Sequence, residues 1–325
     1  MKRVEQGTEE SKRQRLALDC GAADLTYHQE TDYFGLKINL LKSQMQKCVR
    51  RGLEEQAVYA LASMANMARL FPGESRAQGI RTNALNRVIV SALEDVGPAD
   101  PEVVLVVLET LLPMTRSRQR AAFSLAAAVG CVQLLCAARK SRVGSWLHKA
   151  FHARNAALAA AQGFGAELHA VEPISAPLGD ANLFGCLDDA AACGILLERC
   201  EKESRWPALQ RVLRTAWRQL SEKRPAAALA LAVEHYALEP EEARGLALVQ
   251  AQARVDAALI ERLERHDYVI EILACAIDKH TAAGRAQGKG RAEFVSDGAL
   301  VTNEHPRFTD ERHERLRQLY AQSAV

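Results

Sequence analysis

The chain has 325 residues, of which 48% are hydrophobic and 5% aromatic, and its formal net charge is +2. No apolar run reaches about 18 residues and no signal peptide is recognisable, so we expect neither a membrane span nor secretion. The charge is uneven, roughly +9 over residues 35–155 and roughly −5 over 156–325. The composition is rich in Ala, Leu, Arg and Glu, strong helix formers that predict an all-α intracellular protein of two or three domains.

Residues 1–34 are polar and mixed in charge, a composition typical of a disordered arm. Two basic clusters in this arm resemble a bipartite nuclear-import signal with a short spacer, and a solvated tail is the alternative. The clusters consist of Lys2, Arg3, Lys12, Arg13 and Arg15. Nuclear localisation is therefore one expectation.

From residue 35 onward the apolar residues recur with the helical period, which predicts a helical bundle over 35–161. Gly52, Pro72 and Pro113 are each expected to end a helix, because glycine accepts a left-handed cap and proline interrupts helical bonding. The helices are expected at 35–51, 54–70, 80–96, 101–113, 117–137 and 141–161.

The helix expected at 80–96 has a continuous apolar stripe that must be buried. Gly97 and Pro98 are expected to end it, and Pro101 to open the next helix. Glu94 and Asp95 would lie in its last turn, where negative charge opposes the helix dipole. This unfavourable placement predicts that the two carboxylates have a partner.

A second helical region is expected at 182–283, after a Gly- and Pro-rich linker at 162–181. Its helices are predicted at 182–202, 206–221, 225–236, 240–264 and 266–283. A Gly/Lys-rich loop and a short helix at 310–322 would complete the chain over 284–325.

The sequence contains no catalytic motif that we recognise. Gly284, Gly288 and Lys289 do not have the spacing of a Walker A loop, and neither a nucleophile elbow nor a zinc helix is found. The eight cysteines form no Cys-x-x-Cys pair, which favours buried thiols in a reducing compartment over a metal site. We predict no cofactor, no metal and no enzymatic activity.

Seven basic residues are candidates for contact with nucleic acid or a protein partner: Arg81, Arg87, Lys140, Arg142, Lys149, Lys289 and Arg291. Arg87 is expected to reach a carboxylate or a phosphate. Lys140 and Arg142 lie between two apolar helices, where Ser141 can cap the second helix. Phosphate contact and structural capping are both open for this stretch.

Three stretches carry a resemblance to a known family. Residues 86–101, NRVIVSALEDVGPADP, resemble the "RRLVRFASEDIG.ADP" signature of the replication-associated recombination ATPases (RarA/MgsA) and the Werner-helicase-interacting ATPases. Residues 125–150 and 42–64 are similar to two further stretches of that family. The resemblance covers residues 37–155; the family's Pro in "APKS" is Arg139 here, and the ATPase half is missing.

In this AAA+ family the signature lies in the helical domain that follows the ATPase domain and assembles the subunits. The resemblance therefore implies a bundle related to the clamp-loader-type collar over 35–161, homo-oligomerisation, and a non-catalytic role in DNA replication, recombination or repair. It further implies an AAA+ ATPase, a replication protein or DNA as partner. A nuclear-import signal in the 1–34 arm would fit a eukaryote or a large DNA virus infecting one. The alternative is a nucleic-acid-binding or packaging protein that uses the bundle as a scaffold. An unrecognised enzyme in the C-terminal half is a third class.

Overall fold

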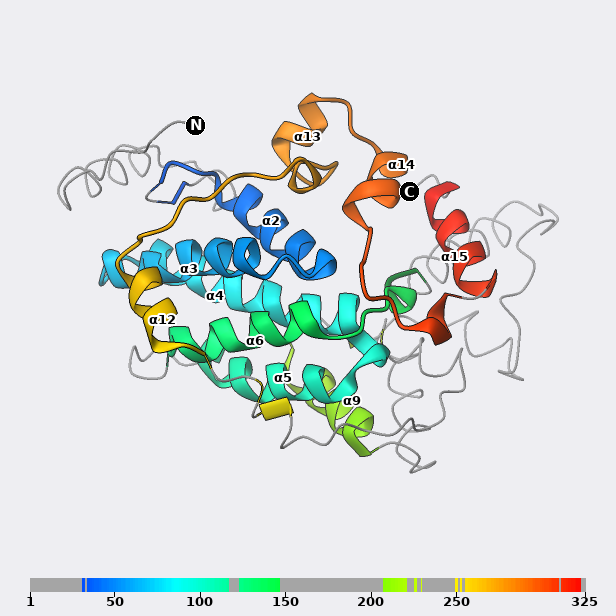
Figure 1. The fold of residues 1–325 in the computed structure, drawn as a ribbon, viewed down its shortest axis with the longest axis horizontal. Coiled ribbons are helices and arrows are strands. Elements are labelled where there is room, and N and C mark those ends of the chain that lie inside the picture. The colour runs from blue at the N-terminus through cyan, green and yellow to red at the C-terminus, as the bar shows by residue number, and fades with distance from the viewer. Residues whose placement is uncertain are drawn as a thin grey trace, which may run out of the picture. The chain divides into compact units, whose positions relative to one another are not determined.

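The computed structural model of the chain describes residues 31–32, 34–116, 123–146, 207–220, 225–226, 229, 249–250, 252, 255–309 and 311–322. These residues are predominantly helical and contain no strand, so the all-α prediction is confirmed for them (Figure 1). None of the described helices is both long and apolar enough to cross a membrane. Four cysteines in these residues are free and buried, as expected, namely Cys48, Cys131, Cys136 and Cys275.

The chain forms two compact units, each assembled from three separate parts of the sequence. Unit 1 comprises Met1–Ile89, Thr110–Ala137 and Gln252–Leu300, and unit 2 comprises Val90–Glu109, Ala138–Ala251 and Val301–Val325. The sequence pattern instead predicts domains that follow one another along the chain. The expected linker at 162–181 lies outside the described residues.

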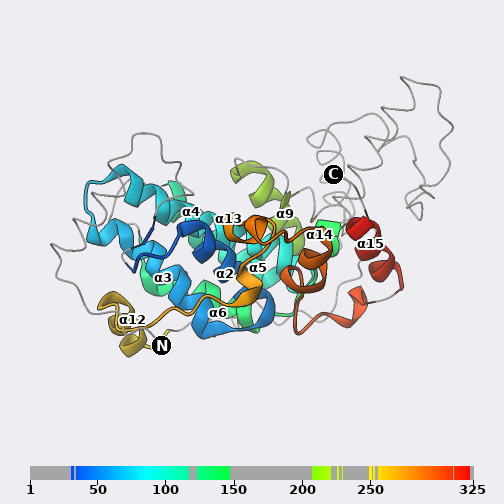
Figure 2. The same ribbon diagram turned by 90° about the horizontal axis from the view of Figure 1, so that it is seen from above.

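The core of unit 1 is built around α3 (Glu54–Leu70), which matches the predicted helix at 54–70. This helix packs against α2 (Ile38–Arg51), α6 (Leu125–Ala137) and α12 (Ala257–Glu264) (Figures 1 and 2). Almost every residue of α3 from Ala57 onward is buried, and its Ala- and Met-rich sequence suits a helix surrounded by others.

A tight loop sets the start of α2 at Ile38, three residues after the predicted start. The buried carboxylate of Asp32 accepts the backbone N–H groups of Phe34 and Leu36 at 3.0 and 2.8 Å. The end is as predicted: Gly52 has φ 67°, and its N–H bonds the carbonyls of Cys48 and Val49.

The helix predicted at 80–96 is α4 (Ser75–Ser91), which begins earlier and ends earlier in regular α geometry. A wider π turn follows over Ala92–Val96, closed by a bond from the Gly97 N–H to the Ala92 carbonyl. Because Gly97 has φ 50° and ψ −126°, it ends the helix without a left-handed α cap. The predicted stripe is buried along its length, from Ile80 to Val96.

Helix α5 (Pro101–Arg116) begins at the proline that the sequence pattern predicts. The predicted end at Pro113 is wrong, because this proline lies inside the last turns of the helix. Its ring removes only the N–H that would bond the carbonyl of Glu109, and Glu109 is on an exposed part of the helix, where water can replace that bond.

The helix predicted at 266–283 is also wrong. Helix α12 ends where His266 adopts φ 59°, and the Asp267 N–H bonds back to the Arg262 carbonyl, an arrangement that turns the chain out of the helix. An extended segment, a 3₁₀ turn and several short turns follow. These short elements are Ala274–Ala276, α13 (Ala282–Ala286), α14 (Arg291–Glu293) and the π turn Phe294–Gly298.

In unit 2, α9 (Pro207–Gln219) and α15 (Glu311–Gln322) agree with the helices predicted at 206–221 and 310–322. A short 3₁₀ turn, Pro306–Phe308, precedes α15. Only residues 143–146 of the helix predicted at 141–161 are described, and they are helical. The helix predicted at 182–202, most of 225–236 and the basic residues of the 1–34 arm lie outside the described residues.

Candidate functional site

Arg81 and Arg87, on α4, make contacts within unit 1. Arg81 is 8% exposed; it donates to the Gln78 side-chain oxygen at 2.6 Å, and its guanidinium lies 4.8 Å from the centre of the Phe123 ring. Arg87 is half-buried and donates to the Gln46 side-chain oxygen at 3.3 Å. This partner is a neutral amide and not the carboxylate that the sequence suggested, and contact of Arg87 with a phosphate stays a prediction.

Lys140 is fully buried in unit 2, with its ammonium 2.9 Å from the carbonyl oxygen of Ala138. Its backbone N–H bonds the Asn303 carbonyl at 3.0 Å, and its own carbonyl accepts the His305 N–H at 2.9 Å. The residue therefore joins two distant parts of unit 2 through its backbone. Its ammonium is not displayed on the surface for a phosphate to reach.

Arg142 forms a buried ion pair with Asp95, with 3.2 Å between Nε and Oδ1, and its guanidinium lies 4.6 Å from the centre of the Trp146 ring. The side chain of Asp95 is fully buried, and its carbonyl accepts the Ser141 N–H at 2.9 Å. The prediction that this carboxylate has a partner is confirmed. Capping by Ser141 is also confirmed, because its hydroxyl accepts the Val143 N–H at 3.3 Å.

Lys289 belongs to the Gly/Lys-rich loop of unit 1, where its ammonium bonds two backbone carbonyls. The distances are 2.6 Å to Ile277 and 3.4 Å to Ala274. The loop therefore uses its lysine to stabilise its own backbone. Arg291 is half-buried. The pKa of Lys279 is lowered mainly by the burial of Lys279 itself, and the positive charge of Arg291 lowers it further. Lys149 lies outside the described residues.

A second set of polar side chains was missed as a site by the sequence analysis, and it follows one side of α2. This α2 polar row consists of Ser43, Gln44, Lys47, Arg50 and Arg51. All five bind the stretch 271–298, which is more than 200 residues away in the sequence. One signal in the sequence could have indicated this site. Polar residues at positions 43, 47, 50 and 51 lie three or four residues apart, which places them on one stripe of the helix.

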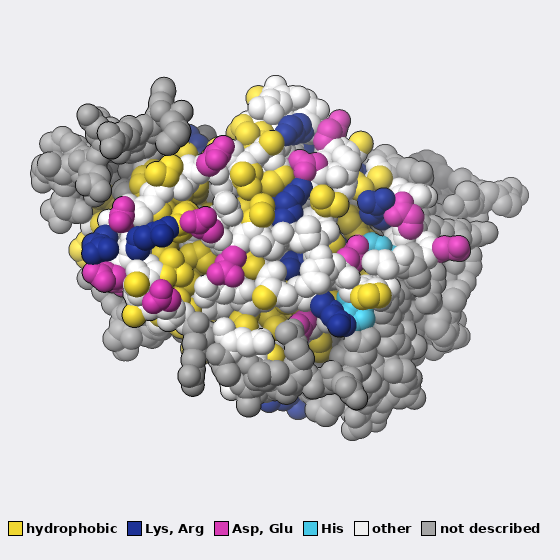
Figure 3. Space-filling model, viewed as in Figure 1, with side chains coloured by type: hydrophobic (Ala, Val, Ile, Leu, Met, Phe, Trp, Pro, Cys, Tyr) yellow, Lys and Arg dark blue, Asp and Glu magenta, His cyan; other side chains and the backbone are white. Residues whose placement is uncertain are grey.

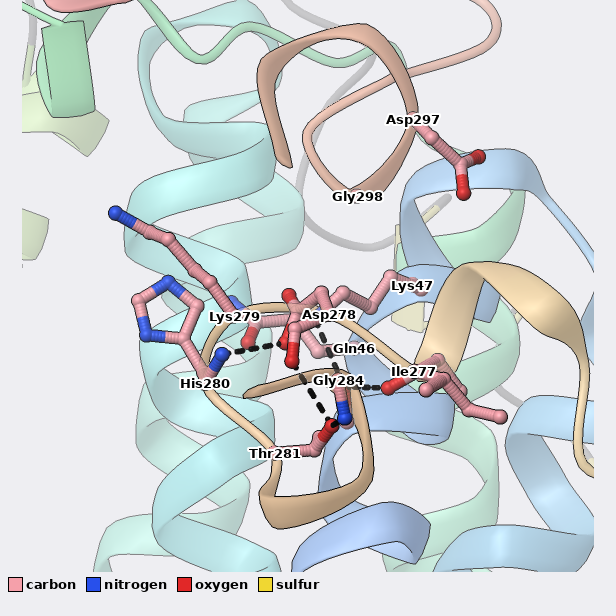
Figure 4. Close-up of polar contacts among 12 residues, drawn as sticks. Gln46, Lys47, Ile277, Asp278, Lys279, His280, Thr281, Gly284, Asp297 and Gly298 are labelled. Atoms are coloured by element: carbon pink, nitrogen blue, oxygen red, sulfur yellow. Dashed lines mark hydrogen bonds and ion pairs between the residues drawn. The ribbon is translucent and has the colours of Figure 1, made fainter. Parts of the chain in front are cut away.

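The centre of this contact is a buried ion pair between Lys47 and Asp278, 2.5 Å apart with 4% exposure on each side chain (Figure 4). Burial raises the pKa of Asp278, but the charge and hydrogen bond of Lys47 outweigh burial, and the net pKa shift is downward. The Asp278 carboxylate is therefore held in its charged form beside the Lys47 side chain. The Asp278 carboxylate also accepts the His280 backbone N–H at 2.9 Å.

Ser43, Lys47 and Asp278 resemble the parts of a hydrolytic centre, but their bonding does not suit one. Lys47 donates to the Ser43 hydroxyl at 2.8 Å, and Ser43 donates its own proton to the Ala276 carbonyl at 2.7 Å. In this geometry Lys47 donates to Ser43 and pairs with a carboxylate, and the serine proton is directed at a backbone carbonyl, so Lys47 is not placed as the base that a serine nucleophile needs. The arrangement holds backbone and does not activate a nucleophile.

The two arginines at the end of α2 complete this contact. Arg50 donates to the Gly298 carbonyl at 2.6 Å, and Arg51 donates to the carbonyl and carboxylate of Asp297 at 2.6 Å each. The ring of Phe294 lies under the charges of Lys47 and Arg50, at 5.7 and 5.9 Å from its centre. The α2 polar row thus fixes the whole turn over Phe294–Gly298.

Within the described part of the chain, no group of three or more metal-binding side chains could hold a metal ion. The chain matches no family model, no curated protein and no solved structure. The described residues thus form a predominantly helical protein in which Arg81, Arg87 and Arg142 bind side chains of the chain itself, and Lys140 and Lys289 bind its backbone carbonyls.

Proposed function

We propose that the chain is a non-catalytic oligomerisation and interaction protein linked to DNA replication, recombination or repair. One observation carries the proposal. Of the seven basic residues that the sequence offers for nucleic-acid contact, five bind groups of the chain itself. These five are Arg81, Arg87, Lys140, Arg142 and Lys289. Side chains used in this way favour a scaffold over a surface that binds phosphates.

A second observation supports a link to the family that the sequence resembles. The buried Asp95–Arg142 pair connects the two stretches with the most distinctive resemblance, 86–101 and 125–150. Two stretches that define one domain in the family would be expected to contact each other in this way. The relation to a clamp-loader-type collar, the assembly with like chains or an AAA+ ATPase, and nuclear localisation are parts of this proposal.

The surface over α12 and the start of α3 agrees with a scaffold. Acidic and basic side chains alternate there (Figure 3), and they pair with one another. Arg265 lies 2.9 Å from Glu261, and Arg262 lies 3.5 Å from Glu55. A surface that attracts nucleic acid is instead expected to gather charges of one sign.

The alternative, a nucleic-acid-binding protein, is favoured by one feature of unit 1. Lys279 and Arg291 are close enough for like-charge repulsion to contribute to the lowered pKa of Lys279, and such a cationic pair attracts anions. We give this function second place because it concerns two residues only.

A salt titration distinguishes the two functions. The full chain is titrated into labelled duplex and single-stranded DNA, and fluorescence anisotropy is followed over a range of salt concentrations. A nucleic-acid binder loses affinity linearly with the logarithm of salt, because counterions are released from each neutralised phosphate. We expect weak binding with a shallow slope. Tight binding with a steep slope, weakened by Lys279→Glu and Arg291→Glu, would favour the alternative.

A further inference from the structure

Residues 268–273 of unit 1, here called the edge segment, lie extended between α12 and the 3₁₀ turn Ala274–Ala276 (Figure 1). Both ends are held firmly. At the first end, the Tyr268 ring stacks on Tyr59 with centres 4.8 Å apart and meets the Phe34 ring edge-on at 5.4 Å. Just beyond the second end, Ser43 bonds the Ala276 carbonyl. The segment is thus presented in one conformation.

One edge of this extended segment is closed by a side chain of the α2 polar row. The Leu273 N–H donates to the Gln44 side-chain oxygen at 2.9 Å, and the Gln44 amide donates to the Glu271 carbonyl at 2.5 Å. These are the two bonds that the N–H and C=O of one residue in a neighbouring parallel strand would make. Gln44 is completely buried, so this imitation of a strand is part of the core.

The opposite edge is open. In an extended chain the backbone groups of successive residues point to opposite edges, so those of Ile270 and Ile272 point away from Gln44. Within the part of the chain that the structure describes, neither residue has a backbone hydrogen bond. Ile270 and Ile272 are only partly buried, and unpaired backbone groups at such an edge can accept another strand.

The outward side chains of this stretch define what such a strand would carry. Val269 is 76% exposed, the largest exposure of a large hydrophobic side chain in the described residues. Asp267 and Glu271 flank it at alternate positions and are also exposed. Neither carboxylate has a hydrogen bond or ion pair with the described part of the chain. Because the side chains of a strand alternate between two faces, a strand that alternates basic and β-branched residues would set its basic side chains beside Asp267 and Glu271 and its β-branched side chains beside Ile270 and Ile272.

We propose that the open edge of residues 268–273 binds an extended, basic and β-branched segment of a partner protein, which adds as a strand. Backbone bonds to Ile270 and Ile272 would supply affinity, and the carboxylates of Asp267 and Glu271 would select basic residues. A second copy of the chain is disfavoured as the occupant, because antiparallel pairing of Ile270 with Ile272 sets Glu271 opposite itself. This inference goes beyond the proposed function and holds whether or not the chain self-associates.

The test uses the full chain and three labelled peptides, each roughly six residues long, the usual length of a strand. The first alternates Val and Lys, the second alternates Val and Glu, and the third is the first with a central proline. We expect the Val/Lys peptide to bind saturably by fluorescence anisotropy. The Val/Glu peptide should bind at least about tenfold more weakly, and the proline peptide should not bind.

Two exposed charge reversals locate the binding. Glu271→Lys should reverse the preference, so that the Val/Glu peptide binds more tightly than the Val/Lys peptide. The matched control Glu74→Lys changes an exposed acid in the turn before α4 and should leave both affinities unchanged. Ile272→Pro removes one open N–H without touching the Gln44 bonds and should abolish binding.

Three results would overturn the inference. These are no saturable binding of the Val/Lys peptide, equal effects of Glu271→Lys and Glu74→Lys, and unchanged affinity in Ile272→Pro. A change in the mass of the chain on Glu271→Lys, without any peptide, would instead assign the edge to a second copy. Circular dichroism of each variant shows whether it has folded.

Discussion

At the scale of single residues, Asp32 makes stability depend on pH. It is 3% exposed and is bonded by the Ser63 hydroxyl and two backbone N–H groups. Burial raises its pKa from 3.8 to about 6 despite these bonds. A folded-state pKa above the unfolded value means that stability is fully present below about pH 4 and is lost as pH rises through about 6.

We predict that Asp32→Asn removes this loss, because the amide keeps the acceptor oxygen and carries no charge. The variant should be more stable than the parent at pH 7 by up to about 3 kcal/mol, the equivalent of the pKa shift. Chemical unfolding of both proteins from pH 4 to pH 7 measures the effect. Parallel pH profiles for the two proteins would show that Asp32 does not titrate in this range.

Position 284 requires glycine, because the backbone of Asp278 lies very close to it. A Cβ at this position would overlap the carbonyl group of Asp278, which belongs to the backbone and cannot rotate away. Gly284→Ala should therefore lower the free energy of unfolding by about 3 kcal/mol or more. The matched control is Gly79→Ala in α4, where a Cβ meets nothing within 4 Å.

The control should raise stability by about 0.5–1 kcal/mol, because alanine has the higher helix propensity and restricts the unfolded chain. Guanidinium unfolding of both variants compares the two sites. A mild effect of Gly284→Ala, similar in size to that of the control, would mean that the turn between Asp278 and Gly284 opens at little cost.

At the scale of elements, the α2 polar row decides how the stretch 271–298 is held. The ion pair of Lys47 and Asp278 is nearly dry, so removing one partner leaves a buried charge uncompensated. Lys47→Met should cost about 3–5 kcal/mol. The double variant Lys47→Met/Asp278→Asn should recover most of that loss, because the Asn oxygen can still accept the His280 N–H.

A double-mutant cycle measures this coupling as the free energy of unfolding of the four proteins. Single-variant losses that simply add in the double variant would indicate no coupling between Lys47 and Asp278. Such a result would remove the electrostatic part of our account of α2.

The elements that could be predicted are those decided by their own neighbours in sequence. The ends of α3, the glycine cap of α2 and the start of α5 at Pro101 all follow from local bonding. The extended stretch after α12 could not be predicted, because its apolar spacing also fits a helix. What makes it extended is the amide of Gln44, which lies 227 residues from Glu271.

In the candidate site, too, features decided by local sequence could be predicted, and features decided by distant segments could not. Asp95 could be predicted to have a partner, because a carboxylate in the last turn of a helix is unfavourable by itself. That Lys140 is buried and that Arg87 meets an amide could not be predicted. Both facts depend on segments that lie far away in the sequence and near in the fold.

At the scale of the whole molecule, each unit combines distant parts of the chain. Because Gln252–Leu300 belongs to unit 1, the α2 polar row requires the C-terminal quarter of the sequence. A chain that ends at residue 251 would leave Lys47, Arg50 and Arg51 without these partners. We predict that this truncation unfolds unit 1 or lowers its stability more than Lys47→Met does.

Thermal unfolding followed by circular dichroism compares the truncated chain with the parent and with Lys47→Met. A truncated chain that unfolds at the same temperature as the parent would mean that α2, α3 and α6 form a stable bundle without residues 252–300. The contacts of the α2 polar row would then be peripheral to the stability of unit 1.

We propose that the chain assembles through protein contacts and not through bound nucleic acid. The most direct test of this proposal is the mass of the full chain by light scattering after nuclease treatment, at low and high salt. We expect one mass that is a higher multiple of 35.7 kDa than a single chain and that persists in both conditions. A mass of one chain at all concentrations, or a larger mass that disappears with nuclease or salt, would contradict it.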